Sequence, residues 1–417
     1  MPPPLQSALG IPFLIFVAWC FSENRSAVSW RIVGTGLLLQ LALALLLLKL
    51  PGSRHLFLML NDLVRALERA TQEGTSFVFG FLGGGEPPFQ LKQGASLHIL
   101  AFQGLPLILV VSALASLLFY WGILPRIVRG VSLLLQRSFG VGGAEGVGTA
   151  ANVFLGMVEA PLFVKPYLSR MHRGEIFSLM STGMATIAGT VMVLYASILS
   201  PVMENAMGHL LTASLISAPA AVAIARIIIP TPGDQVTRAS IQSPVRASGS
   251  MDAVTQGALE GANLLINIIA LLIVLIALVS LCNQILELLP GMGGEPLTLQ
   301  RMLGWIMAPV VWLLGVPWSE CMVAGELMGT KTVLNEFLAY LRLTELPSQD
   351  LSPRSQLIMT YAMCGFANPG SLGIMLGGLG GIAPDRKTEI VELGLKSILA
   401  GTLATCMTGS VVGILLW

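Results

Sequence analysis

Long apolar stretches recur along almost the whole chain, and they constrain the fold more than any other feature. A helix that crosses the hydrocarbon layer of a membrane needs about 20 predominantly apolar residues. The sequence offers seven such stretches, the first somewhat short, at 8–22, 32–50, 97–124, 175–200, 208–230, 259–288 and 390–417. Of its 417 residues 54% are hydrophobic and only 11% are charged, whereas soluble domains carry roughly 25% charged residues. We therefore predict an all-α, polytopic membrane protein.

The composition argues against several other classes of function. The formal net charge is +1, so no basic surface points to nucleic acid. None of the five cysteines belongs to a C-x-x-C pair, and the four histidines are not spaced as metal ligands. The sequence contains no Walker glycine loop and no evident nucleophile–base pair. We therefore predict no enzymatic activity and no cofactor, and a membrane enzyme stays the rival class to be tested.

Two carboxylates stand inside apolar runs, about 180 residues apart. Glu159 lies in the run 156–162, and Glu336 lies in the run 331–337. Each is followed some thirty residues later by a helix broken by small and polar residues, at 184–189 and at 363–368. A charged group at membrane depth is costly and usually marks a path for a substrate or an ion. The repetition indicates two related halves with a binding site where they meet.

Two further regions are hydrophobic but interrupted by glycine and proline. Residues 138–170 begin with a glycine-rich segment, and residues 300–330 contain Pro309, Gly315 and Pro317. Irregular backbone survives at membrane depth only when it is buried in protein or lines a water-filled cavity. We expect a re-entrant hairpin in each region, with a kinked ordinary helix as the alternative.

The remaining segments are more polar. Residues 53–70 mix leucines with charged side chains, as does the shorter segment 126–137, and this pattern predicts amphipathic helices that lie at the membrane interface. The longest polar loop, 231–257, separates the two halves. We therefore predict four units. They are N-terminal scaffold and interfacial helices (1–137), a first hairpin and broken helix (138–230), the polar loop with a scaffold or trimerisation helix (231–299), and a second hairpin, broken helix and C-terminal helix (300–417).

Several of these motifs together resemble the concentrative nucleoside transporter family. The run from Gly148 to Leu162 is similar to the first re-entrant hairpin of that family, and the motifs at 185–189, 335–340 and 364–368 follow in the family's order. The resemblance implies eight spanning helices, two re-entrant hairpins, inverted repeats and a homotrimer. It also implies nucleoside uptake by alternating access across a bacterial inner membrane, driven by a sodium or proton gradient.

The resemblance also implies a substrate site. The family's matching Glu holds ribose hydroxyls, so Glu336 is the strongest candidate, with pairing to Lys331 as the structural alternative. Asn368 and Ser371 match ribose-contacting positions, although Asn368 could simply cap a helix. The other matches are Phe366, which flanks the base or packs in the core, Val191 on the base side, and Glu159 in the hairpin motif.

A sodium site is implied in the same way. Asn152 and Thr186 resemble the side-chain ligands of the family, and the backbone carbonyls of Leu155 and Ile187 would complete the set with water. Broken helices expose carbonyl oxygens, and a hard cation prefers oxygen ligands. These residues favour Na⁺ as the coupling ion. Proton coupling stays open, with Glu159 or Glu336 as the carrier.

One departure from the family pattern affects the expected substrate. Nucleoside-transporting members usually have Gln followed by Thr or Ser where this chain has Met157 and Val158. A buried polar edge without a partner costs roughly 1–3 kcal/mol, and Met suits a less selective, apolar wall. Three interpretations remain: relaxed base preference, preference for purine or modified nucleosides, or transport of another polyhydroxylated solute. A fourth alternative, from another class of function, is a gate-like membrane protein that does not transport.

Overall fold

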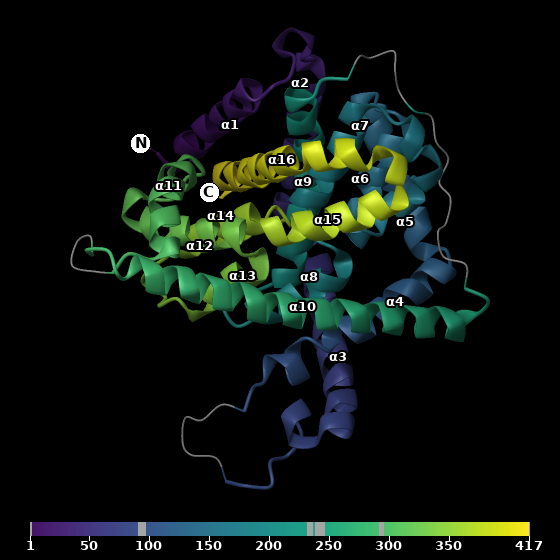
Figure 1. The fold of residues 1–417 in the computed structure, drawn as a ribbon, viewed down its shortest axis with the longest axis vertical. Helices are drawn as coiled ribbons and strands as arrows, with labels where there is room; N and C mark the ends of the chain where they lie inside the picture. The colour runs from purple at the N-terminus through teal and green to yellow at the C-terminus, as the bar shows by residue number, and fades with distance from the viewer. Residues whose placement is uncertain (1, 91–96, 232–236, 238–246, 292–295, 417) are drawn as a thin grey trace.

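The computed structural model describes residues 2–90, 97–231, 237, 247–291 and 296–416, and this part of the chain is helical without a strand. The longer helices of its first part are α1 (Pro3–Cys20), α2 (Trp30–Lys49), α3 (Pro51–Phe79), α4 (Leu107–Tyr120), α5 (Ile123–Phe139), α6 (Gly143–Leu155), α7 (Arg173–Ala185), α8 (Gly189–Leu199) and α9 (Ala206–Ile228). They are followed by α10 (Ser250–Leu286), α11 (Leu299–Leu313), α12 (Cys321–Val333), α13 (Glu336–Glu345), α14 (Pro353–Met363), α15 (Pro369–Ile382) and α16 (Lys387–Leu415). Short helical turns η1 to η7 connect some of them (Figure 1).

The predicted spanning stretches are confirmed. Within the described residues seven helices or helix pairs are long and apolar enough to cross a membrane, and each coincides with one of the seven sequence stretches. The α7–α8 pair counts as one of these because it is a single span broken in the middle. The α14–α15 pair is interrupted in the same way, and α15 is a shorter apolar helix.

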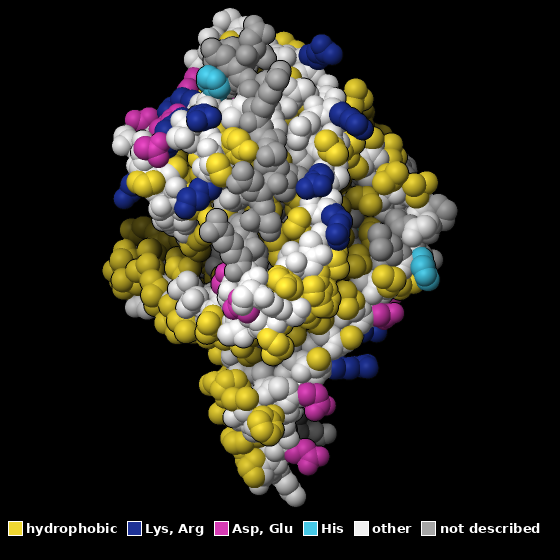
Figure 2. Space-filling view, turned by 90° about the vertical axis from the view of Figure 1, so that its right-hand side faces the viewer, with side chains coloured by type: hydrophobic (Ala, Val, Ile, Leu, Met, Phe, Trp, Pro, Cys, Tyr) yellow, Lys and Arg dark blue, Asp and Glu magenta, His cyan; other side chains and the backbone are white. Residues whose placement is uncertain are grey.

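The two amphipathic segments are helices, and both are longer than predicted. Helix α5 extends the segment 126–137 at both ends, and α3 runs well past residue 70 to Phe79. Helix α3 projects from the helical body at the bottom of Figure 1. Figure 2 shows hydrophobic side chains along one edge of this projection and acidic side chains along the other, as an amphipathic helix requires.

The chain contains two halves with the same order of elements. The first has the hairpin helix α6, a return through η4 (Ala160–Phe163) and η5 (Lys165–Arg170), the broken helix α7–α8 and the long helix α9. The second has the hairpin α12–α13, the broken helix α14–α15 and the long helix α16. The first hairpin lies within the predicted region 138–170.

The second hairpin, α12–α13, lies within the predicted unit 300–417 and overlaps the expected region 300–330 only in part. Over 300–330 the structure has the antiparallel pair α11 and α12, with Pro309 inside α11 and a turn at Gly315, where φ is +108°. The tip that corresponds to the first hairpin is at Leu334 and Asn335, between α12 and α13. No glycine or proline marks this tip.

The core lies where the two halves pack together. Helix α16 packs against α7 and α9 of the first half and against α14 of the second. Helix α16 approaches α7 closely because it carries a glycine at the contact. A Cβ on Gly401 would come within 2.5 Å of the Met184 Cβ. A Cβ on Gly365 would likewise come within 2.8 Å of the Met184 carbonyl oxygen. The broken segments of both halves therefore meet in the middle of the molecule.

Candidate functional site

A cavity of about 150 Å³ opens where the hairpin tips and the broken helices converge. Its walls come from both halves and from α10, which crosses in front of them (Figure 1). All eight substrate residues predicted from the sequence line it: Met157, Val158, Glu159, Val191, Glu336, Phe366, Asn368 and Ser371. Residues separated by more than 200 positions are thus brought into one site.

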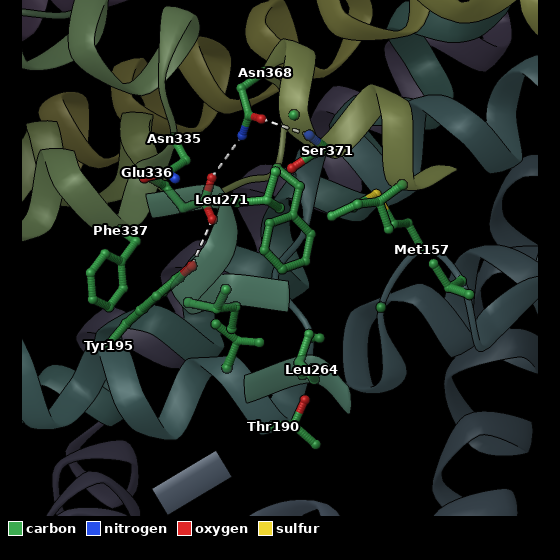
Figure 3. A pocket seen from close by; sticks show the side chains of 18 of the residues that line it. Met157, Thr190, Tyr195, Leu264, Leu271, Asn335, Glu336, Phe337, Asn368 and Ser371 are labelled. Carbon is green, nitrogen blue, oxygen red and sulfur yellow. Dashed lines mark hydrogen bonds between the residues drawn. The ribbon is translucent and has the colours of Figure 1, made fainter. Parts of the chain in front are cut away.

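The polar end of the cavity is built around Glu336. Asn335 caps α13, since its Oδ1 accepts a hydrogen bond of 2.9 Å from the Leu338 amide. Glu336 is therefore the first residue of α13, where the helix dipole favours a negative charge. Its carboxylate accepts hydrogen bonds from the Tyr195 hydroxyl at 2.6 Å and from the Asn368 side-chain amide at 3.1 Å (Figure 3).

The structural alternative for Glu336 was an ion pair with Lys331. The ion pairs among the described residues do not include this one. The carboxylate is held instead by neutral donors from α8 and from the start of α15. Each carboxylate oxygen accepts one of these bonds, so each retains capacity for a further donor.

Asn368 has two roles in the structure. Its Oδ1 accepts a hydrogen bond of 2.8 Å from the Ser371 amide and so caps α15. Its Nδ2 donates to Glu336. The capping alternative considered from the sequence is therefore present together with the contact to the carboxylate. Ser371 lies one turn into α15 and lines the cavity beside them.

The opposite wall is apolar. Met157 is 8% exposed and packs tightly against Gly183. A Cβ added to Gly183 would come within 2.8 Å of the Met157 Cβ. Val158 packs against Gly378 of α15. Phe366 is mostly buried, so it belongs to the core as well as to the cavity wall. Leucine and isoleucine side chains of α10 complete this side: Leu264, Ile268, Leu271, Leu272 and Leu275.

The four predicted sodium ligands lie together behind the first hairpin tip. Asn152 and Thr186 are almost fully buried, and the Thr186 hydroxyl donates a hydrogen bond of 3.1 Å to the Asn152 carbonyl. The Asn152 Nδ2 donates to the Leu179 carbonyl, which leaves its Oδ1 buried without a hydrogen-bond partner among the described residues. Leu155 ends α6 and exposes carbonyls at the negative end of the helix. An unpartnered buried oxygen in such surroundings fits a small cation.

Helix α9 stabilises the break between α7 and α8 beside this site. The Ser214 hydroxyl on α9 accepts a hydrogen bond of 2.9 Å from the Ile187 amide and donates one of 3.4 Å to the Ile187 carbonyl. On the other side, Gly156 at the hairpin tip has φ of +93°, and a Cβ there would lie 2.7 Å from the Ala188 Cβ. The tip therefore needs glycine to pack on the break.

Besides the apolar residues of α10, three polar lining residues were not among the predicted site residues: Tyr195, Asn335 and Thr190. Tyr195 follows Val191 by one helical turn, so a search for residues at i+4 on the same face would have found it. Thr190 has a buried hydroxyl without a hydrogen-bond partner among the described residues. It is a polar group on an otherwise apolar side of the cavity.

Comparison with protein families matches the chain to three models. "Na+ dependent nucleoside transporter N-terminus" matches residues 9–82, "Nucleoside recognition" matches residues 101–202, and "Na+ dependent nucleoside transporter C-terminus" matches residues 209–413.

Similar proteins extend over the whole chain. "Nucleoside permease NupC" of Helicobacter pylori is 36% identical, over 98% of this chain and 97% of that protein. "Putative nucleoside permease NupX" of Escherichia coli is 32% identical, over 98% of both chains. Among solved structures, CNTnw in an inward-facing substrate-bound state has a TM-score of 0.89 and 34% identity, over 98% of both chains. A doubly substituted CNTnw in an outward-facing state has a TM-score of 0.90 and 33% identity, over 99% of this chain and 97% of that one.

Proposed function

Because this chain belongs to the Na⁺-dependent nucleoside transporter family, we propose that it is a Na⁺-coupled nucleoside symporter of a bacterial inner membrane. The observation that carries this proposal is the buried carboxylate of Glu336, held by Tyr195 and Asn368 at the end of a cavity between the two halves. A carboxylate at this depth is costly unless a solute compensates it.

The ribose binds at the polar end of the cavity. Two vicinal hydroxyls donate to the free acceptor sites of Glu336, and charge-assisted hydrogen bonds of this kind are the strong ones. Asn368 and Ser371 orient the sugar from the start of α15. This arrangement favours a nucleoside over a free nucleobase, which brings no hydroxyl pair.

The base lies along the apolar wall, against Phe366 and Val191. Met157 and Val158 provide no strong hydrogen-bonding group for a base edge, so we infer a relaxed base preference. Preference for purine or modified nucleosides is the second interpretation, and another polyhydroxylated solute is the third. Thr190, whose hydroxyl has no hydrogen-bond partner in the described part of the chain, and Glu159 at the hairpin tip are polar groups that remain for the base.

Sodium binds behind the first hairpin tip. Asn152 and Thr186 supply side-chain oxygens, and the carbonyls of Leu155 and Ile187 supply the rest. An ion at this position orders the tip that carries Met157 to Glu159 and so raises the affinity for the substrate, and by linkage the substrate raises the affinity for the ion. Proton coupling through Glu159 or Glu336 is the alternative mechanism.

Transport proceeds by alternating access. The moving unit consists of the two hairpins and the two broken helices, and the scaffold consists of the helices of 1–137 together with α10. The inward-facing and outward-facing states of the similar CNTnw structures support such a cycle. The scaffold assembles three copies in the membrane. Among the candidate spans of the described residues, α10 is the least covered, since only 11% of its most apolar stretch is buried. We assign this helix to the contact between copies.

Uptake into proteoliposomes tests the proposal. Labelled uridine, adenosine and ribose are supplied with and without an inward Na⁺ gradient, each in the absence and in the presence of a protonophore that collapses any proton gradient. We expect concentrative uptake of both nucleosides with Na⁺ only, and little uptake of ribose. Uptake that persists without Na⁺ and stops with the protonophore would establish proton coupling. Uptake of ribose alone would establish another substrate class, and no uptake of any solute by folded protein would refute transport.

A further inference from the structure

Helix α5 carries three arginines that take no part in the proposed binding site. Arg126, Arg129 and Arg137 are spaced at i, i+3 and i+11, so they lie along one side of the helix, which we call the basic stripe. All three are exposed, and the ion pairs and hydrogen bonds among the described residues include none of them. Within the described part of the chain, the charge of the basic stripe is therefore unpaired.

The rest of the α5 surface is divided between the protein and its surroundings. The buried side packs on α6, where a Cβ on Gly146 would come within 2.7 Å of the Gln136 Cγ. Ile127 and Leu134 lie on a further side and are 45% and 44% exposed, although they are apolar. Exposed apolar side chains beside a row of basic ones are typical of a helix at the membrane interface, where the apolar side reaches the acyl chains and the charges stay among the headgroups.

Aromatic side chains indicate the same depth for the start of α5. Helix α4 belongs to a candidate span that stops at Tyr120, and Trp121 follows it directly. These two side chains are 41% and 51% exposed. Trp and Tyr are enriched at the boundary between membrane and water, and α5 begins just after them, at Ile123. The basic stripe therefore begins at the level of the phospholipid headgroups.

The neighbouring helices offer no carboxylate to the basic stripe. Helix α5 packs mainly against α2, α4 and α6. Neither α2, α4 nor α5 itself contains an Asp or a Glu. Helix α6 contains one, Glu145, which is buried in an ion pair with Arg226 of α9. The positive charge of the stripe therefore needs a negative group from elsewhere.

The second half provides an internal comparison. Helix α11 precedes the hairpin helix α12 and packs on it, as α5 precedes α6 and packs on it. Its single arginine, Arg301, is engaged by the protein. The Arg301 guanidinium donates a hydrogen bond of 2.8 Å to the Pro296 carbonyl and lies over the Trp305 ring, 5.9 Å from its centroid. Unpaired charge is therefore particular to α5 and is not shared by the corresponding helix of the second half.

Gly130 leaves room among the three arginines. It lies four residues after Arg126 and directly after Arg129, and a Cβ at this position would meet no atom within 4 Å. The Arg126 guanidinium lies back along the helix, 3.8 Å from the position of a Cβ on Gly122. A phosphate group that enters the space above Gly130 can accept charge-assisted hydrogen bonds from guanidinium groups on either side.

We propose that the basic stripe of α5 binds the headgroups of anionic phospholipids, such as phosphatidylglycerol. The phosphate accepts hydrogen bonds from the arginines, and the acyl chains lie against Ile127 and Leu134. A headgroup with net negative charge is favoured over a zwitterionic one, since each basic side chain near an anionic surface raises the affinity by about fivefold. The site lies outside the substrate cavity, so it does not depend on which solute the protein carries.

The fluorescence of Trp121 measures which lipid lies beside the basic stripe, because this residue adjoins Gly122, over which the Arg126 guanidinium lies. The protein is reconstituted in phosphatidylcholine vesicles that contain phosphatidylglycerol or phosphatidylcholine with brominated acyl chains, and bromine quenches a tryptophan that it touches. The chain has seven tryptophans, so the signal of Trp121 is the difference between the wild type and Trp121→Phe. We expect the apparent affinity for phosphatidylglycerol to exceed that for phosphatidylcholine by at least about fivefold at low salt. The preference should almost vanish in about 1 M NaCl, which screens the charges.

Substitutions on α5 test the arginines themselves, each compared with its own Trp121→Phe derivative. Arg126→Gln combined with Arg129→Gln and Arg137→Gln removes the charge and should bring the ratio of the two affinities to about one. Replacement of the same three residues by Lys keeps the charge and should retain most of the preference. Arg65→Gln combined with Arg69→Gln is the matched control. It removes two exposed charges from α3 and should leave the preference unchanged.

Equal quenching by the two lipids in the wild type at low salt would overturn the proposal, since the arginines would then face water, other parts of the chain or another copy. A preference that survives in the triple Gln variant or in high salt would also overturn it, because apolar contacts would then select the lipid. Folding of each variant is checked by its elution profile and thermal unfolding in detergent. Should the triple variant fail to fold, the wild-type comparison at low and high salt still decides the question. None of these outcomes depends on transport, which the uptake assay tests separately.

Discussion

At the scale of single residues, the cavity depends on how Glu336 is presented. Asn335 caps α13 and places the carboxylate at the positive end of the helix, while Tyr195 and Asn368 each bind one of its oxygens. A carboxylate offers roughly four acceptor sites. Two of them are used by the protein and two remain. The protein thus holds the carboxylate in place without saturating it, as a receptor for a pair of hydroxyls requires.

Glu336→Gln should abolish nucleoside uptake. The amide keeps the shape but brings its own NH₂ group, which cannot accept a hydroxyl proton, and two hydrogen bonds to a charged group are worth roughly 1.5–3 kcal/mol each. We expect the affinity for uridine, measured by titration calorimetry in detergent, to fall by at least about 100-fold. Tyr195→Phe is the matched control, since it removes one supporting bond and keeps the charge, and a loss of only about tenfold or less is expected. Normal uptake by folded Glu336→Gln would remove Glu336 from the site.

Met157→Gln combined with Val158→Thr should raise uridine uptake. The double substitution restores the polar pair that nucleoside-transporting family members usually carry, and each new hydrogen bond to the base contributes about 1 kcal/mol. We expect the KM for uridine to fall by roughly fivefold to tenfold while the KM for adenosine changes less. Met157→Leu keeps an apolar wall and should leave both values nearly unchanged. An unchanged KM for uridine in the double variant would mean that other residues bind the base.

At the scale of elements, the break between α7 and α8 is held open by specific contacts. The α7–α8 break is fixed by Ser214, which binds both the amide and the carbonyl of Ile187. Gly156 allows the first hairpin tip to pack directly on the same break. A spanning helix that is interrupted exposes backbone groups, and these must be satisfied inside the protein. Ser214 therefore acts as a positioning residue for the proposed sodium site.

Ser214→Ala should weaken sodium binding more than substrate binding. Without the hydroxyl, the Ile187 amide loses its partner and the neighbouring carbonyl is free to turn, which costs roughly 1 kcal/mol. We expect the Na⁺ concentration for half-maximal uptake to rise about fivefold, with the KM for nucleoside at saturating Na⁺ almost unchanged. Ser214→Thr keeps the hydroxyl and should restore the wild-type value. An equal rise in both constants would indicate a general loss of structure instead of a local effect on the ion.

Much of this architecture could be predicted from the sequence, because the membrane imposes simple rules on it. The spanning stretches and the two broken helices follow from hydropathy and from short motifs, and eight of the lining residues were implied by the family resemblance. The tip at Leu334 and Asn335 was missed because the stronger breaking signals, Pro309 and Gly315, stand earlier and form the α11–α12 pair. Tyr195 was missed for another reason. The i+4 spacing from Val191 places Tyr195 on the cavity face, but its hydrogen bond to Glu336 joins residues 141 positions apart, and only the folded chain shows that contact.

At the scale of the whole molecule, an exposed ion cluster joins both halves to the first connecting segment. Glu23, between α1 and α2, binds Arg173 at the start of α7 and Lys396 on α16, at 3.2 and 2.7 Å. Although burial raises the pKa of Glu23, hydrogen bonds from Lys396 and Arg173 hold that pKa below its ordinary value. A carboxyl whose pKa is lower in the folded state stabilises the fold above its unfolded pKa. That contribution is lost as the pH falls through the folded pKa.

Glu23→Gln should therefore lower the melting temperature at neutral pH and have no such effect in acid. The side chains are about one-third exposed, so the loss should be at most about 1 kcal/mol. The difference between wild type and variant should shrink below pH ~4, when Glu23 becomes protonated in the unfolded and then in the folded state. Glu68→Gln on α3, a carboxylate outside the ion pairs seen in the described residues, is the matched control. A difference that stays constant from neutral to acidic pH would show that charge is not the cause.

The uncovered side of α10 should be covered by other copies of the chain. One side of this helix lines the cavity, while Leu259, Ile266 and Ile273 recur every seven residues on the other and are 62%, 63% and 65% exposed. A spacing of seven keeps apolar side chains on one seam between packed helices. We therefore expect trimer-sized particles in lipid nanodiscs by mass photometry.

Ile266→Asn should shift them toward monomers, because the seam then carries a polar group. Leu395→Asn on α16, a leucine that is 76% exposed and lies on another helix, should leave the size unchanged. Monomers of the wild-type protein with full transport activity would show that α10 contacts lipid alone.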